Sequence, residues 1–297
     1  MNLLYSTDEE QTMLWNGPAG RAWVEAQDLL DRLFEPFENL LVDLLVEAFA
    51  DKSIRRLLDV GCGTGSTTLA IARRLEAKDD CTGIDISSPM IAVARSRAER
   101  EGIPATFLCA NAQIHAFEPA RFDAIISRFG VMFFSDPGQA FANLRRSAKE
   151  GAELRLLAWR SPEENPFMTE AECVAAPLLP MLSARRSNVP GQFAFANPTR
   201  VYSVLEQSNW SEIEIRPIDV ACSMPEKELT RYLTLLGPVG MALQEVDKET
   251  RTRIVDTIRP AFDRYVHGSE VRFISACWMV RARASRKLGR ISPHKRL

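Results

Sequence analysis

The sequence has little that marks a metal, secreted or membrane protein. Its 297 residues include only three histidines, and its six cysteines form no C-x-x-C pair. Most zinc sites need such spacing, so we expect no metal. No stretch reaches the roughly 18 uninterrupted apolar residues of a spanning helix, and the chain start lacks the basic and apolar regions of a leader peptide. We therefore expect a cytoplasmic protein without a membrane span, whose thiols are reduced.

The chain also lacks a strong charge of either sign. A formal net charge of −2 gives no global field for collecting nucleic acid or an anionic membrane. The exception is the segment 281–297, which carries seven Lys or Arg residues and no acid. Such a tail is typical of a solvated, frayed chain end, and its alternative is a patch for RNA or an acidic protein.

Apolar segments and helical patterns alternate through the middle of the chain. Strands are predicted over 55–60, 81–86, 105–109, 122–127 and 154–159, with helical patterns between them, one of them over 139–148. This alternation predicts a parallel sheet with helices on both faces, because each crossover must return along one side of the sheet. Two later strands, over 212–220 and 271–280, bring the sheet to seven. The predicted fold class is a doubly wound, Rossmann-like α/β sheet, mostly parallel and seven-stranded, with helical cap insertions.

A glycine-rich turn follows the first of these strands. It reads Gly61-Cys62-Gly63-Thr64-Gly65, and the helical pattern begins directly after it. A dinucleotide-binding turn places a third glycine where this chain has Ser66, so the pattern disfavours a nicotinamide cofactor. The turn indicates close approach of the backbone to some other ligand.

The run from Leu57 to Gly65 closely resembles motif I of the class I S-adenosylmethionine-dependent methyltransferases. The resemblance covers roughly residues 55–160 and is strongest to the small-molecule branch that includes the ubiquinone/menaquinone-type C-methyltransferases. It implies S-adenosylmethionine as cofactor, S-adenosylhomocysteine as product, and methyl transfer to a small molecule by in-line displacement.

The same resemblance implies the residues that contact the cofactor. Asp85 stands where the family has a carboxylate that accepts both ribose hydroxyls. Asn111 stands where an Asp that receives the adenine amino group is common, and it offers a neutral acceptor instead. Near the N-terminus, Trp15 or Trp23 would lie against the sulfonium, unless both only pin the segment onto the core. The full set of expected cofactor contacts is Asp59, Gly61, Cys62, Gly63, Gly65, Asp85, Ile86, Met90, Asn111, Ala112, Gln113, Ser127, Trp15 and Trp23.

The acceptor site is expected at the ends of the fourth and fifth strands, where open parallel sheets bind ligands. The tetrapeptide Ser127-Arg128-Phe129-Gly130 is not the Asn/Asp-Pro-Pro-Tyr/Phe motif of enzymes that methylate base amino groups, which argues against nucleic acid. Arg128 would hold a substrate carboxylate or pair with a local acid. The expected acceptor contacts are Arg128, Phe129, Met132, Phe133 and Trp159.

No obligatory catalytic side chain is expected, because the sulfonium donor is already activated and alignment supplies most of the rate. His115 and Arg128 are weak candidates, and His115 is better explained as a structural loop residue.

One domain over 1–297 is expected to carry these parts. A helical cover spans 1–50, in which the main helix over 37–49 begins behind Pro36. The cofactor-binding core spans 51–160, helical insertions over 161–197 and 222–268 form a substrate lid, and 281–297 is the basic tail. A homodimer is compatible with the sequence. Two other functions remain open: an RNA or protein methyltransferase that uses the tail, and a non-catalytic regulatory protein that binds the cofactor.

Overall fold

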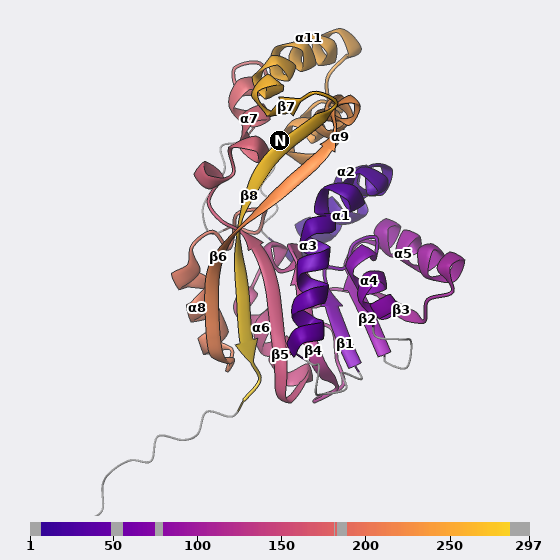
Figure 1. Ribbon diagram of the computed structural model, residues 1–297, viewed down its shortest axis with the longest axis vertical. Coiled ribbons are helices and arrows are strands. Elements are labelled where there is room, and N and C mark those ends of the chain that lie inside the picture. Colours follow the sequence, from indigo (N-terminus) through magenta and orange to yellow (C-terminus); the bar gives the residue numbers. More distant parts are fainter. Residues whose placement is uncertain (1–6, 49–55, 75–79, 181, 183–188, 286–297) are drawn as a thin grey trace, which may run out of the picture.

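A mixed sheet forms the centre of the computed structural model, which describes residues 7–48, 56–74, 80–180, 182 and 189–285 (Figure 1). The strand order is β3-β2-β1-β4-β5-β8-β6. The first five strands run parallel, whereas β8 is antiparallel to both β5 and β6. The strands are β1 (Arg56–Val60), β2 (Asp80–Asp85), β3 (Ala105–Cys109), β4 (Phe122–Arg128), β5 (Ala148–Trp159), β6 (Ser211–Pro225) and β8 (Glu270–Arg283).

The predicted fold class is confirmed, with one strand more than expected. A two-residue strand, β7 (Val266–His267), pairs with the start of β8. Helices cover both faces of the sheet, and alternate residues of β1 separate the two cores. Leu57 packs in a cluster with Leu45 and Ile71, on the face covered by α3 (Gln27–Ala48), α4 (Ser66–Arg74) and α5 (Ser88–Glu101). Leu58 belongs to the larger cluster that contains Leu144, on the face covered by α6 (Pro137–Ser147) and α8 (Pro198–Gln207).

Three helices precede the sheet: α1 (Asp8–Asn16), α2 (Pro18–Glu25) and α3. The prediction that Pro36 begins a helix is wrong, because α3 starts at Gln27 and contains Pro36 in its interior. Proline removes one backbone hydrogen bond there. The fully buried side chains of Leu33 and Phe37 on either side of it indicate that packing outweighs this loss. Trp15 lies on α1, and Trp23 lies on α2.

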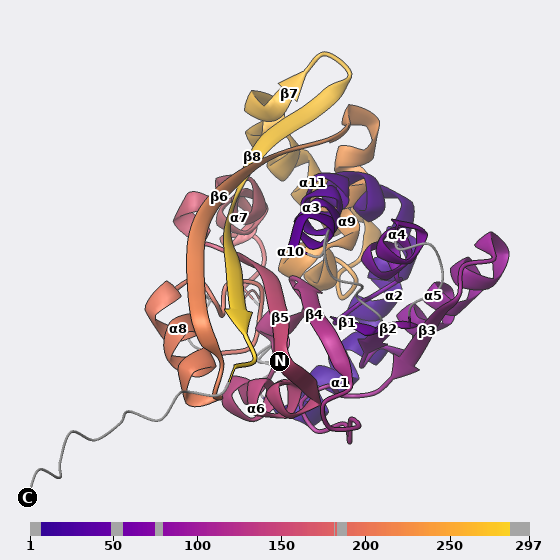
Figure 2. The same cartoon turned by 60° about the horizontal axis from the view of Figure 1, so that its bottom comes forward.

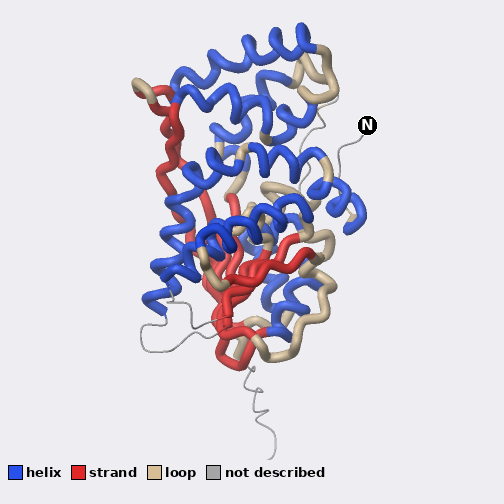
Figure 3. Tube along the Cα trace, turned by 90° about the vertical axis from the view of Figure 1, so that its right-hand side faces the viewer, coloured by secondary structure: helices blue, strands red, loops and turns tan. Residues whose placement is uncertain are grey.

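A long hairpin carries a helical lid above the sheet. Strands β6 and β8 are 15 and 14 residues long and pair from Ser211 and Arg283 up to Pro225 and Glu270. Figures 1 and 3 show both strands running from the sheet into a helical layer at the far end of the molecule. The lid helices are α7 (Pro166–Ala175), α9 (Leu229–Leu235), α10 (Gly237–Ala242) and α11 (Lys248–Ile258) (Figure 2). Short 3-10 turns precede α7 and α9, and another follows α11.

The expected boundary of the second insertion is therefore wrong at its start. Residues 222–225 continue β6, and the helical part begins with the 3-10 turn Glu226–Glu228. The alternating burial of β6 continues to its last residues, as it does in a strand with one face packed. Residues 286–297 of the basic tail lie outside the described part of the chain. Among the described helices, none combines the length and apolar character needed to cross a membrane.

Candidate functional site

The connections reverse direction between β1 and β4, which are neighbours in the middle of the sheet. From β1 the chain continues to β2 and β3 on one side, whereas β4 leads to β5 on the other. Such a switch point opens a crevice at the carboxyl ends of the strands, where ligands of doubly wound sheets bind. The glycine turn leaves β1 at this edge, and the segment from Arg128 to Gly130 leaves β4 beside it.

The backbone of the glycine turn requires glycine at two contacts with neighbouring segments. Gly61, Gly63 and Gly65 all have positive φ angles, of +69°, +56° and +85°. A Cβ atom at Gly61 would lie 2.6 Å from the Cα of Gly130, and one at Gly65 would lie 2.9 Å from the ring of Phe107. The turn is therefore pressed against the β4 exit on one side and against β3 on the other.

The middle glycine, Gly63, differs from the other two because the space that a side chain would occupy is open. A Cβ atom at Gly63 would have only the Met90 sulfur within 4 Å, at 3.8 Å. The Gly63 amide donates to Asp85 Oδ2 at 2.9 Å, and the Ser87 amide donates to Asp85 Oδ1 at 2.8 Å. Gly63, Met90 and Asp85 thus border one space at the ends of β1 and β2.

Two carboxyl groups at this edge are buried. Burial raises the pKa of Asp59 to about 6, against the lowering effects of the Thr68 hydroxyl, which donates to Oδ2 at 2.7 Å, and of the Arg128 charge. Burial also raises the pKa of Asp85, partly offset by the amides that donate to it. Both sites disfavour an unpaired negative charge, so a donor or a cation beside either group would stabilise its ionised form.

Helix α1 is bonded to the loop after β2. The Asn16 amide donates to the Ile86 carbonyl at 3.0 Å and accepts from the Ser88 backbone at 2.8 Å. The Ser87 hydroxyl donates to the Trp15 carbonyl at 2.6 Å. A Cβ atom at Gly20 would lie 2.8 Å from that hydroxyl, so α2 also approaches this loop closely.

The start of α1 is bonded to the loops after β3 and β4. Gln113, 4 % exposed, donates to Asp8 Oδ2 at 3.1 Å and accepts from the Asp136 amide at 2.9 Å. The Ser135 hydroxyl forms a short bond with the other oxygen of Asp8. Helix α1 therefore lies across the carboxyl ends of β2, β3 and β4, as a cover would.

Aromatic rings connect this cover to the ends of β4 and β5. Phe129 stacks on Trp159 with ring centroids 4.0 Å apart and an interplanar angle of 7°. Phe34 of α3 contacts both Phe129, at 5.7 Å, and Trp23, at 6.2 Å. Trp15 meets Trp23 edge to face at 5.9 Å, and it meets Phe133 at 5.0 Å. Phe37 contacts Phe34, Phe129 and Trp159, so seven rings form one continuous cluster above the strand ends.

Met132 and Asn111 occupy structural positions near this cluster. Met132 is 1 % exposed, and its sulfur accepts from the Trp159 amide at 3.4 Å. The Asn111 side-chain oxygen accepts from the Gln113 amide at 2.9 Å and so shapes the loop after β3. Ala112 and Cys62 are buried, each 6 % exposed.

Arg128 is engaged by protein groups rather than directed into the crevice. Its Nη2 donates to Ser66 Oγ at 2.9 Å, and its Nη1 lies 4.0 Å from a carboxylate oxygen of Glu38. Ser127 has a structural position, because its fully buried hydroxyl donates to the Val60 carbonyl at 2.7 Å and accepts from the Gly130 amide.

His115 is placed in the loop after β3, where its ring packs edge to face on Phe117 at 4.7 Å. Its carbonyl accepts from the Asn143 side chain at 2.9 Å. These contacts connect the loop to α6, and none of them reaches the strand-end crevice.

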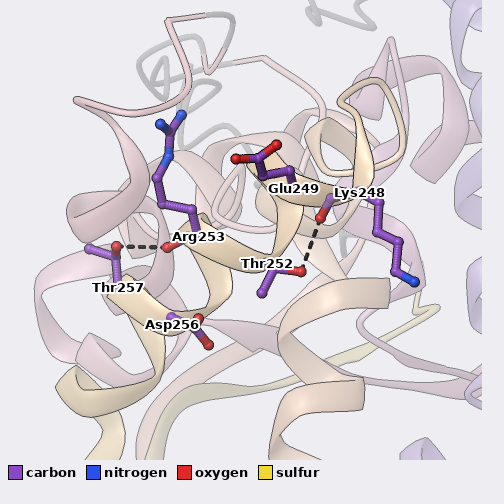
Figure 4. Close-up of a pocket in the computed structure, with 6 residues that line it drawn as sticks. All are labelled: Lys248, Glu249, Thr252, Arg253, Asp256 and Thr257. Carbon is purple, nitrogen blue, oxygen red and sulfur yellow. Dashed lines mark hydrogen bonds between the residues drawn. The ribbon is translucent and has the colours of Figure 1, made fainter.

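Two surface hollows lie in the lid. A hollow of about 710 Å³ runs along the exposed side of α11, and Figure 4 shows six polar side chains of that one helix around it. Thr252 and Thr257 bond there to carbonyls one turn earlier on the same helix. A second hollow, of about 390 Å³, lies between Arg160, Phe167 and Asp219, where Arg160 is paired with Asp219 and Glu164. Neither contains a residue of the glycine turn.

Sequence reasoning missed the polar residues that hold the cover in place: Asp8, Asn16 and Ser87. One signal was present for the first helix, because Thr7 and Glu10 form a capping box at the start of α1. No local pattern indicates that Asn16 reaches a loop 70 residues away.

Comparison with known proteins agrees with this arrangement. Residues 57–151 match the sequence model of a family described as a methyltransferase domain. A demethylmenaquinone methyltransferase of Thermus thermophilus is 31 % identical over 173 residues, which cover 57 % of this chain and 76 % of that protein. A ubiquinone/menaquinone biosynthesis C-methyltransferase of Marinomonas sp. is 28 % identical over 44 % of this chain, and the match spans about half of that relative's length, 53 %. A structure of a putative methyltransferase from Bacillus halodurans superposes with a TM-score of 0.54 at 17 % identity, covering 82 % of this chain and 99 % of that chain.

Fold, glycine turn and family match together define a methyltransferase. The chain belongs to the class I S-adenosylmethionine-dependent methyltransferases, in the branch of the quinone C-methyltransferases. The predicted family, enzyme class and cofactor are thereby confirmed, whereas the roles of individual site residues stay predictions.

Proposed function

We propose that this protein transfers a methyl group from S-adenosylmethionine to a small, largely apolar acceptor that carries an aromatic or quinone-type ring. The observation that carries the acceptor class is the cluster of seven aromatic rings over the ends of β4 and β5, roofed by α1 and α2. Two of the relatives named above are called methyltransferases of demethylmenaquinone or of ubiquinone/menaquinone biosynthesis, and a quinone-type ring would pack on such an aromatic surface. A solvent-exposed RNA or protein chain does not call for one.

The residues at the strand ends fit the cofactor. Gly63 lacks a side chain where the space beside Met90 is open, so the backbone can approach a ligand there. Each oxygen of Asp85 accepts one backbone amide and retains acceptor capacity for one ribose hydroxyl. Asn111 keeps its amide near the adenine position, and Ala112 and Ile86 border it. Asp59 would lie beside the ammonium group of the cofactor. We assign the remaining predicted contacts, Gly61, Cys62, Gly65, Gln113 and Ser127, to shaping this site.

The chain contributes to methyl transfer mainly by aligning the acceptor with the methyl group and by excluding water. The bound cofactor supplies an activated methyl group on a sulfonium, whose positive charge aromatic faces attract. Trp15 and Trp23 stand on the cover at the place from which they would face that charge. Phe129, Phe133 and Trp159 would hold the acceptor ring in line with the methyl group, and Met132 would support Trp159 through the contact of its sulfur. Arg128 and His115 are engaged elsewhere, and we give neither a part in proton transfer.

Calorimetric titration of the purified protein with S-adenosylhomocysteine tests the cofactor site. We expect micromolar binding and at least tenfold weaker binding by Asp85→Ala, because the variant loses both hydroxyl acceptors. Asp123→Ala is the matched control, because Asp123 lies at the start of β4, far from the carboxyl ends of the strands, and pairs with Lys149. Equal binding by Asp85→Ala and the wild type would remove Asp85 from the site.

The acceptor class is tested by transfer of a radiolabelled methyl group. A reduced 1,4-naphthoquinone with an apolar side chain is compared with total RNA and with a protein extract. We expect labelling of the naphthoquinol only, and at least tenfold slower labelling with Trp159→Ala, because the ring loses its stacking surface. Labelling of RNA or protein in preference to the quinol would replace this proposal with the alternative acceptor class.

A further inference from the structure

Two arginines from different elements hold the residues on either side of Gly65. Arg97 of α5 donates from Nη1 to the Thr64 carbonyl at 3.1 Å. Arg128 at the end of β4 donates from Nη2 to the Ser66 hydroxyl at 2.9 Å. Their side chains are only 11 % and 13 % exposed. The last part of the glycine turn is therefore fixed from both sides by buried guanidinium groups.

The same two arginines hold helix α3. Arg97 Nη2 pairs with Asp31 Oδ2 at 2.8 Å, while Arg128 Nη1 donates to the Phe34 carbonyl at 3.5 Å and lies 4.0 Å from Glu38. Asp31 and Glu38 are seven residues apart, two helical turns, so both carboxylates project from one side of α3. Each arginine thus joins the N-terminal helices to the glycine turn.

We propose that Arg97 and Arg128 are positioning residues that couple docking of helix α3 to the shape of the glycine turn, so that the turn accepts the cofactor only when the N-terminal helices are in place. The guanidinium group suits this task because its planar fork serves two acceptors at once, which a lysine ammonium does less well. If α3 left its place, both arginines would lose the carboxylates that pair with them and hold them beside the turn. Docking of the N-terminal helices over the ligand and ordering of the glycine turn then occur together.

This inference rests on the proposed placement of the cofactor at the glycine turn. Its key test is Asp31→Asn, because Asp31 pairs with Arg97 and no hydrogen bond joins it to the turn. Arg97→Met removes both contacts at once. Arg95→Met is the matched control: Arg95 lies on the same helix but donates to the backbone carbonyl of Phe107 in β3 and not to the turn itself.

Two measurements are made on the full chain: affinity for S-adenosylhomocysteine, and amide hydrogen exchange of residues 61–66 without ligand. We expect about tenfold weaker binding by Arg97→Met and about threefold by Asp31→Asn. The double variant should bind within twofold of Arg97→Met, because the two changes break one linkage. Exchange in 61–66 should quicken in both variants, and Arg95→Met should match the wild type in both measurements.

The outcomes separate this inference from the proposed site. Two results would overturn the coupling while wild-type binding stays tight and the cofactor site stands. The first is that the effects of Asp31→Asn and Arg97→Met on affinity multiply in the double variant. The second is that Asp31→Asn leaves the exchange of residues 61–66 unchanged. If Arg97→Met does not fold, Asp31→Asn still decides through its exchange pattern. Absence of S-adenosylhomocysteine binding by the wild type would overturn both.

Discussion

Replacing Gly61 with alanine is expected to lower the free energy of unfolding by about 2 to 5 kcal/mol. The left-handed backbone at φ +69° costs an alanine about 1–2 kcal/mol. The new methyl group would also lie 2.6 Å from the Cα of Gly130, and backbone has no rotamer with which to move away. Separating two packed segments costs a further 1–3 kcal/mol or so. Denaturant unfolding monitored by circular dichroism measures the difference.

Two other glycines serve as controls for the two contributions. Gly102 has a φ of +64° and no atom within 4 Å of an added Cβ, so Gly102→Ala reports the backbone cost alone. Gly63→Ala, at φ +56° with only the Met90 sulfur nearby, should cost as little stability but should block the cofactor. Equal destabilisation by Gly61→Ala and Gly102→Ala would mean that the turn separates from the β4 exit without cost.

The sheet and its glycine turn could be predicted because their signals are local. A buried strand such as β1 is marked by its apolar run, and a left-handed turn is marked by glycine. The long arms of the hairpin are different, since residues 221–225 and 270–274 pair with each other beyond the end of β5. Their extent depends on the lid helices that pack on them, which no short window of sequence contains.

The candidate site likewise contains residues whose position could be predicted from the sequence and residues whose contacts could not. Asp85 follows a predicted strand at a fixed place, so its position at the sheet edge could be inferred from the sequence. Arg128 was placed at the correct strand end, but its side chain pairs with Glu38 and Ser66, two partners that tertiary packing alone brings together. The direction of a long side chain depends on such partners, so strand position alone did not predict it.

Replacing Asp59 with asparagine is expected to stabilise the protein at pH 7.5 by about 3 kcal/mol. Burial raises the pKa of the Asp59 carboxyl from 3.8 to about 6, so the folded protein binds a proton more tightly than the unfolded chain between these values. The contribution of this group to stability is present below pH 3.8 and is lost as the pH rises through 6, at 1.36 kcal/mol per pKa unit. Asparagine has no charge to bury, and its oxygen can still accept the Thr68 hydroxyl.

The pH dependence distinguishes this cause from a packing effect. Between pH 4 and 7 the wild type should lose roughly 2 kcal/mol that Asp59→Asn retains, as measured by denaturant unfolding at each pH. The same difference at every pH would show that charge burial is not the reason. Arg128, Glu38 and Asp85 are the charges that act on Asp59, and they stay unchanged in the variant.

A carboxylate that lowers stability at neutral pH needs a compensating role. The ammonium group of the cofactor is a cation that would stabilise the ionised form of Asp59. We therefore expect Asp59→Asn to bind S-adenosylhomocysteine at least tenfold more weakly at pH 7.5 while it unfolds at a higher denaturant concentration. Calorimetry tests the expected loss of affinity, and denaturant unfolding of the same preparation tests the expected gain in stability. A variant that gains stability without losing affinity would place Asp59 outside the binding site.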